Sequence, residues 1–303
     1  MGLWGDIIEF ASSKLAFFPP RPPTYRIAKG GDGKLRMLGQ GILGNRPCLK
    51  HCTVLKLDTK ERKEGGGGET IVALHVPCPT ESSVTILFSH GNAVDLGVMQ
   101  YHYRYLSNVL GVNVFGYDYS GYGASTGKPT VRNTVADLRA CWDCLIDRFG
   151  AKPENIILYG QSIGSGPTSE FAAKEAVERI GGVVLHSPLA SGMRVLRPNI
   201  KHWPAWLDIY PNFKHLPQIN CPVCILHGTE DEVIDISHGK LLYDLCKRPA
   251  NALWAEGYDH QNLDASPLYI PTLEKFLQGI FPDHQLASDP KRLTPGALRP
   301  YFD

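Results

Sequence analysis

From residue 84 onward, short continuous apolar runs alternate with amphipathic stretches, and this alternation restricts the possible folds more than any other feature of the chain. The runs are VTILFSHG (84–91), VNVFGYDY (112–119), NIILYGQS (155–162), GGVVLHSP (181–188), PVCILHG (222–228) and NALWAEG (251–257). The clearest amphipathic stretch has one apolar helical face, formed by Val131, Val135, Leu138, Trp142, Leu145 and Phe149. Continuous Val, Ile and Leu strands separated by helices predict an α/β fold, with a mostly parallel sheet covered by helices on both faces.

Upstream of these runs, two segments alternate apolar and polar residues in the manner of a β-hairpin. They are TVLKLDT (53–59) and TIVALHVP (70–77), and KERKEGGGG (60–68) between them is a solvated turn. The hairpin raises the predicted sheet to eight strands. At 189–217, prolines and aromatic residues interrupt the strand–helix rhythm. This interruption predicts a short lid over the carboxyl edge of the sheet, where open α/β sheets bind their ligands.

The same patterns divide the chain into three parts. Residues 1–23 are an apolar helix with a Pro-rich link, residues 24–281 form one domain, and residues 282–303 are a polar, proline-broken tail that we expect to be disordered. The 303 residues, 43% of them hydrophobic, supply enough apolar material for one large core. A formal net charge of +1 removes the main argument for nucleic acid as a partner.

Two C-x-x-C pairs raise the alternative of a zinc site. Cys141 and Cys144 fall inside a helical pattern, however, and Cys221 and Cys224 lead into an apolar strand. We therefore expect buried thiols in a reducing compartment, and no metal or other cofactor. The segment GYGASTGKP (121–129) resembles a phosphate loop, but its spacing is wrong and Pro129 stands where Ser or Thr is required.

The N-terminal segment MGLWGDIIEFASSKLAFFPP has no basic region before its apolar residues, which argues against a secretory signal. No apolar run reaches the ~18 residues that a membrane span needs. Its apolar residues recur at helical spacing, so the helix either lies in a membrane interface or docks on the domain. Gly2 suits N-myristoylation, although Asp6 stands where that motif prefers Ser or Thr. We expect a cytoplasmic protein, peripheral on the cytosolic face of membranes.

A serine lies between two glycines at the junction of a predicted strand and a predicted helix. The segment is IILYGQSIGSGP (156–167), and it places Ser162 between Gly160 and Gly164. G-x-S-x-G in a strand–turn–helix context is a nucleophile elbow, a sharp turn that raises the serine oxygen above the sheet. The amides of the following helix then point at developing negative charge. Ser162 is therefore the predicted nucleophile.

A nucleophilic serine needs a base and an acid that orients the base, and in this architecture the order along the chain is Ser, Asp, His. HGTEDEV (227–233) follows a predicted strand and supplies Asp231, with Glu230 and Asp235 as alternatives. EGYDHQN (256–262) follows the next strand and supplies His260. His238 falls within a helical stretch and His284 in the tail, so His260 is the predicted base.

The tetrahedral intermediate of acyl transfer needs two amide donors for its oxyanion. Ile163, the residue after the nucleophile, is expected to supply one. The loop after VTILFSHG is expected to supply the other, from Asn92 or, as the alternative, Ala93. His90 in this loop is expected to pack beneath it and not to act as the base.

With these residues identified, the chain resembles the α/β-hydrolase superfamily across residues 53–280, and within it the family of alpha/beta hydrolase domain-containing protein 17. The supporting stretches are KLAFFPPRPPTY, LFSHGNAVDLG, DYSGYGASTGKP, LYGQSIGSGPT, LHSPLASGMRV, HGTEDEVIDISHG and GYDHQN. The resemblance implies a membrane-associated serine hydrolase that removes palmitoyl groups from protein cysteines, with Ser162, Asp231 and His260 as its triad. Unlike the cysteine-rich start of the animal members, this chain has no cysteine before Cys48, and GYDHQN replaces the expected Gly-x-Gly-His loop.

The expected substrate is an S-acylated protein or a lipid ester, cleaved through an acyl-serine intermediate. Trp203, Trp206 and Tyr210 are expected either to line an acyl-chain groove or to pack within the lid. Two alternatives stay open. One is a carboxylesterase or lysophospholipase acting on small lipid esters, because the triad is common to all these enzymes. The other is a non-catalytic hydrolase fold that serves as a binding module.

Overall fold

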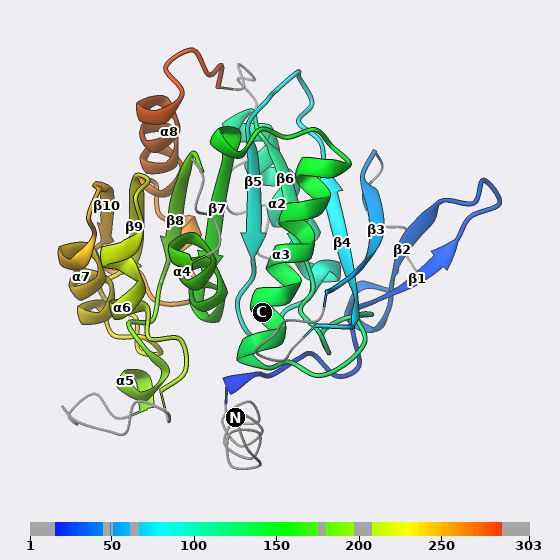
Figure 1. The fold of residues 1–303 in the computed structure, drawn as a ribbon, viewed down its shortest axis with the longest axis horizontal. Coiled ribbons are helices and arrows are strands. Elements are labelled where there is room, and N and C mark those ends of the chain that lie inside the picture. Colours follow the sequence, from blue (N-terminus) through cyan, green and yellow to red (C-terminus); the bar gives the residue numbers. More distant parts are fainter. Residues whose placement is uncertain are drawn as a thin grey trace.

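The computed structural model describes residues 16–44, 49, 51–60, 67–174, 180–196 and 208–286. Its centre is an eight-stranded sheet in the order β10-β9-β8-β7-β5-β6-β4-β3 (Figure 1). The strands are β3 (Thr53–Asp58), β4 (Thr70–Val76), β5 (Thr85–Ser89), β6 (Asn113–Tyr117), β7 (Ile156–Gln161), β8 (Gly182–His186), β9 (Val223–Gly228) and β10 (Pro249–Ala255). The pairs β3–β4 and β4–β6 are antiparallel and the other five neighbouring pairs are parallel. The predicted mostly parallel sheet is therefore confirmed strand by strand.

Helices cover both faces of this sheet. The helices α3 (Val131–Asp147), α4 (Ser165–Lys174) and α7 (Ile236–Leu245) pack on one face, and α2 (Leu96–Leu110) and α8 (Tyr269–Ile280) pack on the other. In Figure 1, α3 and α4 lie in front of the sheet and α2 lies behind it. Short turns of 3-10 helix also lie in the connections, among them η1 (Gly41–Leu43), η2 (Pro153–Asn155), η5 (Leu216–Gln218) and η6 (Leu263–Ala265). Among the described residues, no helix combines the length and the apolarity needed to cross a bilayer.

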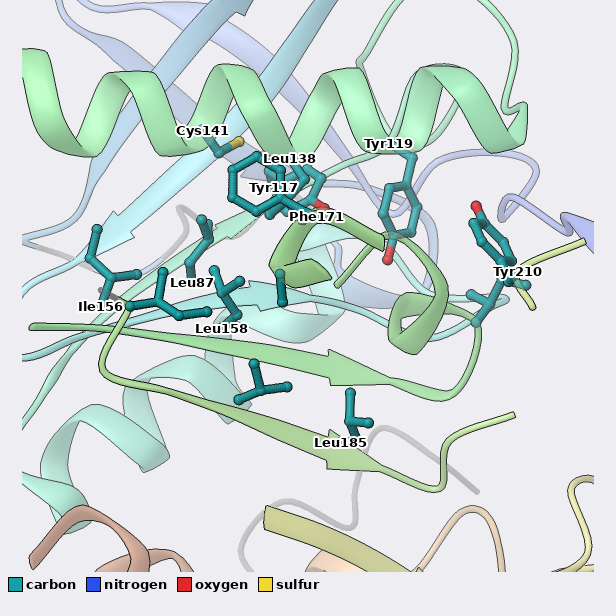
Figure 2. Close-up of a cluster of buried hydrophobic side chains, with 14 of the residues drawn as sticks. Leu87, Tyr117, Tyr119, Leu138, Cys141, Ile156, Leu158, Phe171, Leu185 and Tyr210 are labelled. Carbon is teal, nitrogen blue, oxygen red and sulfur yellow. The ribbon is translucent and has the colours of Figure 1, made fainter. Parts of the chain in front are cut away.

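Each central strand contributes alternate residues to two separate cores. In β7, Leu158 belongs to the core beneath α3 and α4, whereas Ile157 and Tyr159 belong to the core beneath α2 and α8. Figure 2 shows the first core, in which Leu158 and Leu185 point from their strands toward α3. Because both faces of the strands are covered, their sequences are apolar throughout instead of alternating.

The cysteines of the two C-x-x-C pairs lie in these cores. Cys141, Cys144, Cys221 and Cys224 are buried, free thiols, as predicted. Burial raises the pKa of each of them, so they stay protonated at neutral pH. In the described parts of the chain, no group of three or more His, Cys, Asp and Glu side chains is arranged to hold a metal ion.

One hairpin was not expected from the sequence. β1 (Tyr25–Lys29) and β2 (Leu35–Gly39) pair antiparallel as a separate two-stranded sheet. Their exposure does not alternate strictly, so YRIAK and LRMLG lack a clear period of two. The hairpin is held instead by Tyr25, which is fully buried and donates a 2.5 Å hydrogen bond to Asp118 at the end of β6.

The predicted lid and tail are only partly described. Of the lid at 189–217, the structure describes α5 (Gly192–Leu196) and α6 (Asn212–His215), while 197–207 lie outside the described residues. The tail was expected to be disordered from residue 282. His284 nevertheless forms a 2.7 Å hydrogen bond with the Leu110 carbonyl oxygen, so packing on the domain continues past that boundary.

Asp137 is a buried carboxyl group on α3 that holds the loop after β6. Its two oxygens accept hydrogen bonds from the Ser120 amide (2.7 Å) and the Ser120 hydroxyl (2.8 Å). Burial raises the pKa of Asp137 to about 7, although the bonds from Ser120 oppose the shift. The folded protein therefore keeps this proton at pH values where the unfolded chain, with an Asp pKa of about 3.9, has lost it. Stability from this group is fully present below that value and is lost as the pH rises through 7.

We therefore expect Asp137→Asn to become more stable relative to wild type as the pH rises from 5 to 8. The relative gain in the free energy of unfolding should reach about 2 kcal/mol, because Asn carries no charge to desolvate. Urea unfolding at several pH values measures this difference. Asp143→Asn, on the same helix, is the control and should differ from wild type by a constant amount. A difference for Asp137→Asn that is equally constant with pH would contradict the prediction.

Candidate active site

Ser162 sits on a strained turn between β7 and a 3-10 turn, η3 (Ser162–Gly164), that leads into α4. Its φ of 52° is in the left-handed region that non-glycine residues seldom occupy. The two flanking glycines have no room for a side chain. A Cβ built on Gly160 would lie 2.7 Å from the Gly164 carbonyl oxygen, and one built on Gly164 would overlap the Ser89 carbonyl group. The local geometry is that of a nucleophile elbow.

The structure brings Ser162, His260 and Asp231 together in one hydrogen-bonded chain. The Ser162 hydroxyl lies 3.0 Å from His260 Nε2, and His260 Nδ1 lies 2.7 Å from Asp231 Oδ2. Because an ionised carboxylate only accepts, Nδ1 carries the proton and Nε2 is left to accept from the serine. Asp231 follows β9 and His260 follows β10, so both reach the carboxyl edge of the sheet at which β7 ends. The His260 side chain keeps 17% of its surface exposed, which leaves the reacting end accessible.

The alternative acids are placed elsewhere. Asp235 is the N-cap of α7, where its carboxylate accepts a 2.9 Å hydrogen bond from the Ser237 amide. Glu230 is exposed to solvent. Of the three acidic candidates, Asp231 is therefore the one that contacts His260.

Asp231 is surrounded by donors that keep it ionised. Its Oδ1 accepts from the amides of Val233 (3.0 Å) and Ile234 (2.7 Å), and its Oδ2 also lies 3.3 Å from His227 Nε2. Burial by itself raises the pKa of Asp231, but the hydrogen bonds from His227 and His260 outweigh it and hold the pKa well below the usual range. The carboxylate therefore stays charged at neutral pH and can orient the imidazole.

His227 is a site residue that sequence reasoning missed. It is fully buried at the end of β9, and its Nε2 donates a 2.7 Å hydrogen bond to the Ile234 carbonyl oxygen. This hydrogen bond fixes the loop that carries Asp231 to the end of β9. The only available signal was its position four residues before Asp231 in HGTED. A histidine there is equally compatible with simple packing in a strand.

The loop after β5 supplies the second side of the site. Gly91 faces the nucleophile, because a Cβ built on it would lie 3.6 Å from Ser162 Cβ. The Ala93 amide donates a 3.1 Å hydrogen bond to the Phe18 carbonyl oxygen and is not available to an oxyanion. The Asn92 amide has no acceptor among the described residues, so Asn92 is the remaining candidate of the two. The Ile163 amide lies in the first turn of the helix, where amides lack intrahelical partners.

His90 packs beneath this loop, as predicted. It is fully buried, and its Nδ1 donates a 2.7 Å hydrogen bond to the Gly91 carbonyl oxygen. Its Nε2 lies 3.2 Å from Asp118, the same carboxylate that binds Tyr25 of the N-terminal hairpin. His90 is therefore not part of the hydrogen-bonded chain at Ser162.

The predicted aromatic substrate contacts receive no support from the one residue that can be placed. Tyr210 is fully buried, and its hydroxyl group lies 2.5 Å from Thr134 Oγ1. It belongs to the core of Figure 2, so the prediction that it lines an acyl-chain groove is wrong. Trp203 and Trp206 lie outside the described residues.

Comparison with known proteins finds hydrolases among the relatives of this chain. A family model described as serine aminopeptidase, S33, matches residues 80–214. Human alpha/beta hydrolase domain-containing protein 17B is 43% identical over 268 residues, which cover 88% of this chain and 90% of that protein. Protein 17C of Xenopus tropicalis is 40% identical over 287 residues, covering 90% of each chain.

Solved structures share the fold at low sequence identity. The Pyrococcus furiosus esterase Pf2001 has a TM-score of 0.61 at 18% identity, covering 76% of this chain and 93% of that one. Est1E from Butyrivibrio proteoclasticus, with ferulic acid bound, has a TM-score of 0.59 at 16% identity, covering 75% of this chain and 99% of that one.

A parallel sheet covered on both faces, with a serine on a strained strand–helix turn at its carboxyl edge, defines an α/β-hydrolase. The similarity to proteins 17B and 17C extends over nearly nine-tenths of the chain. The chain belongs to the alpha/beta hydrolase domain-containing protein 17 family.

Proposed function

We propose that this hydrolase acts by nucleophilic catalysis at Ser162, with His260 as general base and Asp231 as the acid that orients it. The observation that carries the proposal is the continuous chain of hydrogen bonds from Ser162 through His260 to Asp231. Each of the three residues follows a different strand, and the three are far apart in sequence. A purely structural role explains one buried Asp–His pair, but it does not explain why the pair ends on a serine with a strained backbone.

The proposed reaction has two steps. His260 Nε2 takes the proton of Ser162 as the serine oxygen attacks the acyl carbonyl, and the amides of Asn92 and Ile163 hold the oxyanion. The intermediate collapses, the carbon–sulfur bond breaks, and the leaving thiolate takes the proton from His260. His260 then removes a proton from water as the water oxygen attacks the acyl-serine. The bond between the acyl carbon and the Ser162 oxygen breaks, His260 returns the proton to that oxygen, and the fatty acid is released. In sum, a thioester and water give a carboxylic acid and a thiol.

The proposed substrate is the palmitoyl thioester of a cysteine in another protein. Support comes from membership of the family, because the resemblance of this chain to that family implies depalmitoylation. Small lipid esters are the competing substrates, since the same three residues serve both reactions. We further propose that the protein contacts the cytosolic face of membranes through its N-terminal residues. Phe18, at the start of the described chain, is consistent with this, with 56% of its surface exposed.

Comparison of substrates tests this proposal. We expect kcat/KM for a palmitoylated cysteine peptide to exceed that for a short-chain ester by about tenfold or more, because a long acyl chain adds apolar contact in the transition state. Activity of the Ser162→Ala variant is subtracted as background in both assays. A clear preference for the short ester would sink the depalmitoylase assignment while leaving the hydrolase in place.

A further inference from the structure

Three residues at the start of the described chain, Ala16–Phe18, lie against the loop after β5, and we call them the strap. In Figure 1 the described chain begins in dark blue at the lower edge of the sheet, the edge toward which the arrow of β5 points. The strap contacts the loop mainly through its own backbone. Asn92 Nδ2 donates to the Ala16 carbonyl oxygen (2.5 Å), and Asn92 Oδ1 accepts from the Phe18 amide (3.0 Å).

Two further contacts complete this arrangement. The Tyr122 hydroxyl group donates to Asn92 Oδ1 (2.6 Å) and accepts from the Phe18 amide (3.1 Å), so it bridges the loop and the strap. The Ala93 amide donates to the Phe18 carbonyl oxygen (3.1 Å). Burial raises the pKa of Tyr122, so its phenol stays protonated and able to donate. Every polar atom of the Asn92 side chain is thus bound.

Phe17 anchors the strap in the hydrophobic core. Its ring is buried, and it meets the ring of Tyr210 edge-on at a centroid distance of 6.3 Å. Phe18, the next residue, points outward and is largely exposed. The Phe17 side chain therefore attaches the strap to the core. The backbone of the strap forms the hydrogen bonds to Asn92 and Ala93.

We propose that the strap is a positioning element for the oxyanion donor, which it holds through the side chain of Asn92 and the amide of Ala93. The proposal rests on the proposed function, in which the Asn92 amide binds the oxyanion. Fixing the side chain of Asn92 on one side and the amide of Ala93 on the other fixes the backbone between them. Ala93 has a φ of 60°, a conformation that a non-glycine residue keeps only when its surroundings hold it.

The strap also decides which amide of the loop is free. Because the Phe18 carbonyl oxygen occupies the Ala93 amide, the Asn92 amide is left to the substrate. An amide that already points at the oxyanion position need not reorient when the oxyanion forms. It therefore stabilises the transition state more than it stabilises the bound substrate. Loosening the strap should therefore lower kcat and leave KM nearly unchanged.

Tyr122→Phe is the sharpest test, because it removes one bridging hydroxyl group and leaves no cavity. We expect kcat for an activated ester to fall about 5- to 10-fold, less than the ~100-fold or more expected when an oxyanion donor is removed outright, with KM within about twofold. Tyr103→Phe is the matched control. The Tyr103 hydroxyl group is equally buried but has no hydrogen-bond partner among the described residues, so kcat should not change.

Three further variants separate positioning from folding. Asn92→Ala keeps the backbone amide but loses the side chain that the strap holds, and kcat should fall about 10- to 100-fold. Phe17→Ala should lower kcat about tenfold, and Phe17→Leu, which restores the apolar anchor, should recover most of it. A strap that only stabilises the fold would instead lower the melting temperature of these variants and leave kcat per folded molecule unchanged.

The possible outcomes distinguish this proposal from the proposed function. Turnover that depends on Ser162 but is the same in wild type, Tyr122→Phe and Asn92→Ala would overturn the role of the strap alone. A fall confined to kcat in both variants, with normal melting temperatures, is the expected result. Absence of any Ser162-dependent turnover in the wild-type protein would overturn the proposed function, and the role of the strap with it.

Discussion

Replacing Ser162 with Ala is expected to abolish covalent labelling by a fluorophosphonate probe and to lower kcat by about 10⁴- to 10⁶-fold. The probe forms its bond with the serine oxygen, which is the only atom lost in the variant. His260 keeps its hydrogen bond to Asp231, but it has no serine hydroxyl group from which to take a proton. Ala fits the turn between the strand and the helix about as well as Ser does. The fold should therefore persist, and a melting curve checks this.

Ser169→Ala is the matched control for this experiment. Ser169 lies in α4, seven residues after Ser162, and its buried hydroxyl group has no partner among the described residues. Labelling and turnover should both survive this substitution. Labelling that persists in Ser162→Ala would show that another residue reacts with the probe, and it would remove Ser162 from the proposed role.

Asp231→Asn is expected to lower kcat by about 10³- to 10⁴-fold with little change in KM. The carboxylate accepts from the Val233 and Ile234 amides and from His260. An Asn side chain has one acceptor and one donor, so its NH₂ group must face a donor on one side. If it faces His260, it favours the tautomer with the proton on Nε2, which cannot take the proton of Ser162.

Asp235→Asn provides the control for this loop. Asp235 is four residues farther along and was the alternative acid on sequence grounds, but its carboxylate caps α7. Asn caps a helix about as well as Asp, so kcat should stay within about twofold of wild type. Steady-state kinetics of both variants on one ester substrate give the comparison. Equal losses in the two variants would show that the loop is merely disturbed, and they would contradict the specific role of Asp231.

The strands and the three residues at Ser162 were predictable because their signals are local. The central strands β5 to β9 are continuous apolar runs, since both of their faces are buried. Ser162 follows β7 directly, and Asp231 and His260 lie in the loops after β9 and β10. Parallel strands bring their carboxyl ends to one edge. The order of elements therefore places residues 69 and 98 positions from the serine beside it without any knowledge of side-chain contacts.

The contacts that hold the loops could not be predicted, because they join residues that are far apart in the sequence. Asn92 binds the strap across 74 residues of sequence, and no periodic pattern connects the two. β1 and β2 have mixed exposure, so they carry no clear period, and they are anchored by two buried side chains, Tyr25 and Met37. Tyr210 was misread because an aromatic residue in an irregular segment can equally face a ligand or fill the core. Only its fully buried position decides between these.

The seating of the strap has a thermodynamic consequence for the residues that precede it. Residues 1–15 are continuous in the chain with the strap. A molecule or surface that binds these residues more tightly when the strap lies against the loop after β5 would increase the fraction of molecules in which the strap lies there. Binding at the N-terminus and binding of the oxyanion are then linked, and the linkage is reciprocal. Under the proposed role of the strap, a transition-state analogue held at Ser162 would strengthen the binding of any ligand of the N-terminal residues, by the same factor by which that ligand strengthens binding of the analogue.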